Sequence, residues 1–92
     1  MHPGLVTFEL HEASIHLQQL VAELRDGTID ERGEPALSVS LAHLLDHLCR
    51  AWNGKDLTPE QHAALSQDEF EHLSHTVPNF EGDRVIGEYA YA

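Results

Sequence analysis

The sequence predicts an all-α protein, a small bundle of three to four helices. Two long segments, about residues 7–26 and 35–53, carry apolar residues at intervals of three and four. Two helix-start motifs follow in close succession, at Thr58 and Ser66. The chain has 92 residues, of which 41% are hydrophobic, enough for one small domain with a thin core. We therefore expect a single helical domain over residues 1–92, with two long antiparallel helices, a bent third arm and an extended C-terminal tail.

The first long helix is expected over residues 7–26. Gly27 supplies its C-terminal stop. A second, narrower apolar line of Phe8, Ile15 and Ala22 indicates that this helix contacts two neighbours, one of which is the C-terminal segment or another subunit. Its main apolar stripe consists of Leu10, Ala13, Leu17, Leu20, Val21 and Leu24.

The second long helix is expected over residues 35–53, as the central packing element. The polar segment 26–35 before it contains two glycines and a proline, which predicts a loop. Pro35 suits the first turn of the helix, and Gly54 marks its end. We expect the core to be built on its apolar stripe, which consists of Leu37, Leu41, Leu44, Leu45, Leu48 and Trp52.

The third arm is expected to bend. Thr58 with Gln61, and Ser66 with Glu69, each match a capping box, in which the first residue caps a helix and the fourth reaches back. We expect helices at 59–65 and 67–75 with a bend near Ser66, and the alternative is one continuous helix. Residues 76–92 form the tail, in which 84–91 is either a strand or, as we favour, an extended segment.

Charge and composition exclude several classes of partner. Sixteen Asp and Glu oppose five Lys and Arg, a formal net charge of −11, so nucleic acids and anionic membranes are not expected partners. No apolar stretch approaches the roughly 20 residues needed to span a bilayer. The single cysteine, Cys49, is expected to be a buried hydrophobe, and its isolation favours a reducing cytoplasm.

Histidines offer the one candidate site. His43 and His47 stand four residues apart in the second long helix, a spacing that places both imidazoles on one side at neighbouring turns. Two further ligands for zinc or nickel would come from Glu12 and His16, or from Glu69 and His72.

The helical wheel argues against a functional metal site. His16 falls with four polar residues on an acidic ridge (Glu9, Glu12, Gln19 and Glu23), away from the leucine stripe. His43 likewise falls on the polar side, near Arg50. From sequence alone we therefore expect a solvated face, with adventitious binding of zinc or nickel more probable than a dedicated centre.

Enzymatic chemistry has no sequence support. None of the serines stands in a nucleophile-elbow pattern, and the six glycines do not form a phosphate loop. The sequence therefore predicts a non-enzymatic interaction or accessory module that acts as a homodimer. The alternative function is a metal-binding helical protein that uses His43 and His47 with carboxylate or histidine ligands from a neighbouring helix.

Overall fold

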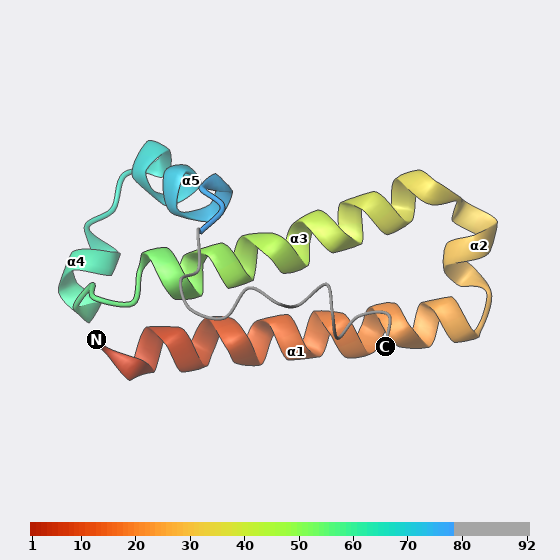
Figure 1. Cartoon of the computed structure of the whole chain (residues 1–92), viewed down its shortest axis with the longest axis horizontal. Helices are drawn as coiled ribbons and strands as arrows, with labels where there is room; N and C mark the ends of the chain where they lie inside the picture. Colours follow the sequence, from red (N-terminus) through yellow and green to blue (C-terminus); the bar gives the residue numbers. More distant parts are fainter. Residues whose placement is uncertain (79–92) are drawn as a thin grey trace, which may run out of the picture.

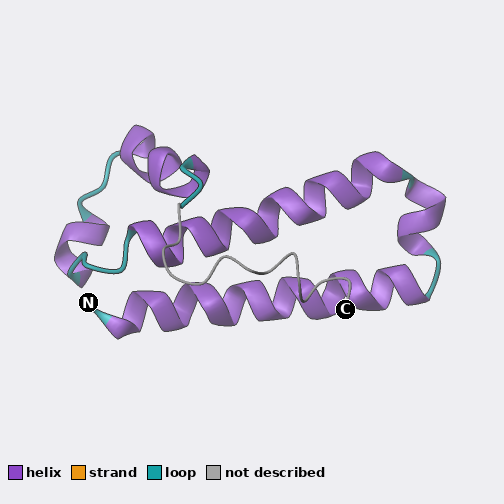
Figure 2. Cartoon of the chain, in the orientation of Figure 1, coloured by secondary structure: helices purple, strands orange, loops and turns teal. Residues whose placement is uncertain are grey.

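The computed structural model describes residues 1–78, and these form an all-α protein (Figures 1 and 2). This confirms the predicted fold class. Residues 1–78 contain five helices, two of them long. The helices are α1 (Pro3–Arg25), α2 (Thr28–Arg32), α3 (Glu34–Asn53), α4 (Pro59–Ala63) and α5 (Gln67–His75). The predicted tail segment 84–91 lies outside the described residues.

The two long helices form an antiparallel hairpin closed by α2 at one end (Figure 1). Leu20 of α1, Ile29 of α2 and Ala36 of α3 are buried together there, so all three elements share one small core. The expected loop at 26–35 is therefore partly wrong, since α2 is a helical turn inside it. Gly27 and Gly33 flank α2 with φ of 85° and 88°, a backbone region that glycine adopts without strain.

Helix α1 begins earlier than the apolar pattern indicated. Pro3 occupies its first turn, where the missing N–H costs nothing, and the helix starts there instead of near residue 7. The backbone N–H of His2 donates to the carbonyl of Lys55 at 2.6 Å, which ties the start of α1 to the connection between α3 and α4.

Both predicted capping boxes are present, and the arm bends at Ser66 as expected. The Thr58 hydroxyl accepts from the Gln61 N–H at 3.1 Å, and the Ser66 hydroxyl accepts from the Glu69 N–H at 3.1 Å. The reciprocal side-chain bonds are also formed. The alternative of one continuous helix is wrong, because Ser66 takes an extended backbone to serve as a cap.

Helix α5 packs across the C-terminal half of α3 (Figure 1). The Asn53 side-chain amide donates to the carbonyls of Leu73 and Thr76 at 2.9 and 2.7 Å, which satisfies the free carbonyls at the end of α5. The Arg50 guanidinium lies 4.9 Å from the ring centre of Phe70. One turn of α3 thus holds α5 in place.

The large apolar residues of α3 are only partly buried. Leu37 and Leu44 pack on the core of Leu20, Ile29 and Ala36. The other four members of the predicted stripe were expected in the core, and this is wrong for the described residues: they keep between 42% and 51% exposure (Leu41, Leu45, Leu48 and Trp52). Cys49, beside them, is fully buried as predicted. None of the helices in residues 1–78 combines the length and the apolarity that crossing a membrane requires.

Candidate metal site

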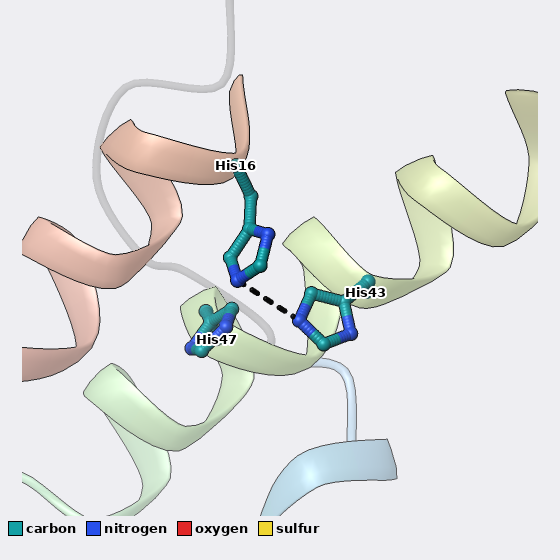
Figure 3. A group of neighbouring side chains, drawn as sticks. All are labelled: His16, His43 and His47. Atoms are coloured by element: carbon teal, nitrogen blue, oxygen red, sulfur yellow. Dashed lines mark hydrogen bonds between the residues drawn. The ribbon is translucent and has the colours of Figure 1, made fainter. Parts of the chain in front are cut away.

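Three imidazoles from two helices converge between α1 and α3 (Figure 3). His16 comes from α1, and His43 and His47 come from successive turns of α3. One ring nitrogen of each residue lies within 4.8 Å of the other two. His43 Nε2 is 3.2 Å from His16 Nε2. The two helices are therefore held at a distance that brings together side chains 27 residues apart.

His47 is the buried member, with 7% of its surface exposed. Its Nδ1 lies 3.0 Å from Glu9 Oε1 and 3.0 Å from Nη2 of Arg50. A carboxylate only accepts and a guanidinium only donates, so Nδ1 cannot bond to both groups. Because Arg50 already donates to Glu9 and to Ser74, we assign the Nδ1 proton to the Glu9 contact. In the neutral imidazole the lone pair is then on Nε2.

That Nε2 atom is buried and has no hydrogen-bond partner among the described residues. A buried polar atom left unpaired costs about 1–3 kcal/mol, and native structures rarely tolerate it without a reason. Metal-binding histidines have this arrangement: one ring nitrogen offers its lone pair to the metal ion, and the other donates to a carboxylate that fixes the orientation of the ring.

Glu9 anchors the network behind the histidines and is itself only 3% exposed. Its second oxygen accepts from Nε of Arg50 at 2.7 Å. Nη1 of Arg50 donates in turn to the Ser74 hydroxyl at 2.9 Å, and that hydroxyl donates to the Phe70 carbonyl. Hydrogen bonds through Glu9, Arg50 and Ser74 therefore link α1 through α3 to α5.

His43 is the exposed member of the trio, on the open side of the cluster. Its pKa is lowered from the ordinary value of 6.5, first by desolvation and then by the neighbouring His16, His47 and Arg50; Asp46 opposes the shift. A lowered pKa keeps this imidazole neutral near pH 7. Neutral imidazole is the form that binds metal.

Only three of the six predicted ligands come together. His16, His43 and His47 form the cluster, and the other three candidates stand outside it in the described structure. Glu12 is half-buried on α1, whereas Glu69 and His72 are exposed on α5. The Glu69 carboxylate accepts from the Ser66 backbone N–H at 2.9 Å, which explains its place in the sequence as a capping residue.

The expectation that this face of the hairpin is solvated is wrong for two of its residues. Glu9 and His47 are buried, because α3 packs against α1 at the part of the ridge where Glu9 meets His47 and Arg50. Glu9 had no predicted role beyond its place on that ridge. A usable signal was its distance of seven residues, two helical turns, from His16 on the same side.

Comparison of the chain with protein-family models, curated proteins and solved structures found no match. The function is therefore argued from the geometry of the cluster and of the helix surfaces.

Proposed function

We propose that the protein binds a divalent transition-metal ion, zinc in the first place, through His16, His43 and His47. The observation that carries the proposal is the buried, unpartnered Nε2 of His47, in a ring whose centre lies 5.2 Å from that of His16 and 4.9 Å from that of His43, and whose Nδ1 contacts Glu9. Imidazole suits zinc, nickel and copper, and three histidines with a carboxylate behind one of them are a recurrent zinc ligand set.

The spacing of the nitrogens supports the same conclusion. Two imidazole nitrogens bound tetrahedrally to zinc at 2.0–2.1 Å stand about 3.3 Å apart. The His16 and His43 Nε2 atoms are 3.2 Å apart, and all three ligand nitrogens lie within 4.8 Å of one another. Rotation of side chains brings the third nitrogen into range, because His16 and His43 are not fully enclosed.

Calorimetric titration of the chelator-treated protein with zinc tests this proposal. We expect one site per chain, and His16→Ala, His43→Ala and His47→Ala each to weaken binding at least ten-fold. His11→Ala is the matched control, because His11 is an exposed histidine on α1 away from the cluster. An equal loss in His11→Ala would mean diffuse surface binding, and an unchanged melting temperature after exhaustive chelation would refute the site.

A second proposal is that the protein works as a homodimeric interaction module. On α3, the exposed Leu41, Leu45, Leu48 and Trp52 follow one line at helical spacing, and on α1 Leu10, Leu17 and Leu24 follow another. The two lines meet in a groove of about 370 Å³ lined by Leu10, Leu45, Leu48 and Trp52 among others. A second hairpin laid on this face would complete a four-helix bundle.

Sedimentation equilibrium over a concentration series tests the dimer. We expect Leu45→Glu to produce monomers, because it places a charge in the apolar face. Val39→Glu is the matched control, since Val39 is 70% exposed on the opposite side of α3, beside His43. Deletion of residues 84–92 is expected to weaken association and leave the helix content intact. A wild-type monomer at high micromolar concentration would refute the proposal.

We further propose that the protein resides in a reducing compartment such as the cytoplasm. Its single cysteine supports this: Cys49 is fully buried, and burial raises the pKa of its thiol, so it has no part in a disulfide framework. Fractionation of cells that express an epitope-tagged chain, with markers for each compartment, would place it; a secreted or periplasmic protein would contradict the proposal.

A further inference from the structure

The three-histidine cluster borders an open cleft between α1 and α3. The cleft has a volume of about 250 Å³, and two of the three histidines, His16 and His43, stand at its edge. His47 does not line it and lies on the other side, against Glu9 and Arg50. The cluster is thus closed behind by a hydrogen-bonded network and open toward the cleft.

The walls of the cleft have a definite chemistry. Leu20 and Val39 supply apolar surface, and Ser40 supplies a hydroxyl. Gln19 and Glu23 supply the other polar groups, and the Gln19 amide donates to the Glu23 carboxylate at 3.0 Å. Among the lining residues within 1–78, the only formal charge, apart from a protonated histidine, is therefore the negative charge of Glu23.

The number of protein ligands also matters. Within residues 1–78, the group of converging ligand atoms contains three imidazoles and no cysteine or carboxylate. Structural zinc sites have four protein ligands, whereas sites with three protein ligands keep the fourth position for water or another small molecule. Three protein ligands beside a cleft therefore leave a fourth coordination position at which water and other small molecules can exchange.

We propose, on the basis of the metal site above, that the bound metal ion keeps its fourth position open to a small neutral donor ligand from this cleft. The class is that of neutral nitrogen or oxygen donors of about the size of imidazole, with water as the resident ligand. Glu23 favours them over anions, because its carboxylate on the cleft wall repels negative charge and accepts a hydrogen bond from a ligand N–H or O–H.

Cobalt(II) in place of zinc makes the fourth position visible, because its absorption bands respond to coordination. The full-length chain is loaded with cobalt(II) and then titrated with imidazole, and in parallel with azide. We expect imidazole to shift the bands saturably without loss of intensity, and azide to bind less tightly. In Glu23→Gln, azide binding should tighten several-fold while cobalt affinity and imidazole binding stay unchanged.

Ser40→Trp is expected to fill the cleft and abolish the imidazole shift while the cobalt bands remain. Glu23→Gln keeps the test valid if that larger side chain disturbs the fold. Loaded protein that responds to neither probe has a closed site, which overturns this inference and leaves the metal proposal standing. The inference is also overturned if Ser40→Trp keeps the imidazole shift and Glu23→Gln leaves azide binding unchanged. It is likewise overturned if the cobalt bands fade because imidazole removes the metal. Wild-type protein that binds no cobalt refutes the metal proposal itself.

Discussion

Glu9 lies two helical turns before His16 on α1, and both of its carboxylate oxygens are used inside the protein. One faces Nδ1 of His47 and the other accepts from Arg50, at 3.0 and 2.7 Å. A buried carboxylate with two partners has two consequences at once. It compensates the Arg50 charge, and it fixes the tautomer of His47, so that its Nε2 carries the lone pair.

Replacing Glu9 by Gln is expected to lower both stability and metal affinity. The free energy of unfolding should fall by about 3 kcal/mol, because the part-buried Arg50 charge loses its partner. Zinc affinity should fall roughly 10–100-fold, because the ring of His47 loses its carboxylate. Urea denaturation and calorimetry measure the two effects.

Glu12→Gln is the matched control for Glu9→Gln, one turn further along α1. We expect its stability to change by less than about 0.5 kcal/mol and its zinc affinity to stay the same. If Glu12→Gln instead weakened zinc binding as much as His43→Ala, Glu12 would be a ligand, as one of the sequence-based alternatives held.

The lowered pKa of His43 predicts how the stability of the metal-free protein depends on pH. Because this pKa is lowered in the fold, the unfolded chain takes up the proton first as the pH falls. The free energy of unfolding therefore keeps its full His43 contribution above 6.5, the ordinary pKa that applies to the unfolded chain. It loses that contribution as the pH falls from there through the lower pKa of the folded protein. Urea denaturation in the presence of chelator, repeated over a pH series, should show that the free energy of unfolding falls more steeply with decreasing pH in wild type than in His43→Gln. Identical pH profiles would mean that His43 is not perturbed.

At the scale of single elements, short helices depend on their ends. α5 has nine residues, too few to be stable in isolation, and it relies on the Ser66 capping box and on contacts with α3. Glu69 takes part as well: hydrogen bonds from Ser66 lower the pKa of its carboxyl. The stability that the ionised Glu69 carboxylate contributes is present above the ordinary pKa of 4.5 and is lost as the pH falls through the lower pKa of the folded protein.

Ser66→Ala should lower the free energy of local unfolding of α5 by about 1 kcal/mol, since the Glu69 N–H loses its acceptor. Amide hydrogen exchange reports this directly: exchange in the first turn of α5 should become about five-fold faster. Ser38→Ala is the control, because Ser38 is an exposed serine within α3, where no such change is expected. Equal protection in Ser66→Ala and wild type would show that packing on α3 alone holds the helix.

For the whole molecule, charge opposes the proposed dimer. Each chain carries a formal −11, so two chains repel one another while their apolar faces attract. Salt screens the repulsion: the Debye length falls from about 30 Å at 0.01 M to about 10 Å at 0.1 M.

Raising sodium chloride over that range should therefore tighten self-association, measured by sedimentation equilibrium. Leu45→Glu serves as the control and should stay monomeric at both concentrations. Association that weakens with salt would show that ion pairs, not the leucines of α1 and α3, hold the copies together.

The elements were predictable because their signals are local. A capping box involves four residues, and Thr58 and Ser66 gave the starts of both short helices correctly, although α4 ends at Ala63 and not at residue 65 as expected. The two long helices followed from apolar periodicity, and the end of α3 at Asn53, before Gly54, was confirmed. The start of α1 at Pro3 was missed, because the first turn of a helix carries little periodic signal.

The sequence by itself determined that the protein is helical and acidic and that His43 and His47 share one side of a helix. Tertiary structure alone decided that His16 joins them, that Glu9 is buried, and that Leu45 and Trp52 stay partly exposed. The physical reason is that a helical wheel fixes angles around one axis, whereas burial depends on which neighbour covers each face. His47 and Arg50 of α3 cover Glu9 on the acidic side of α1, and the apolar periodicity of α1 contains no information about that contact.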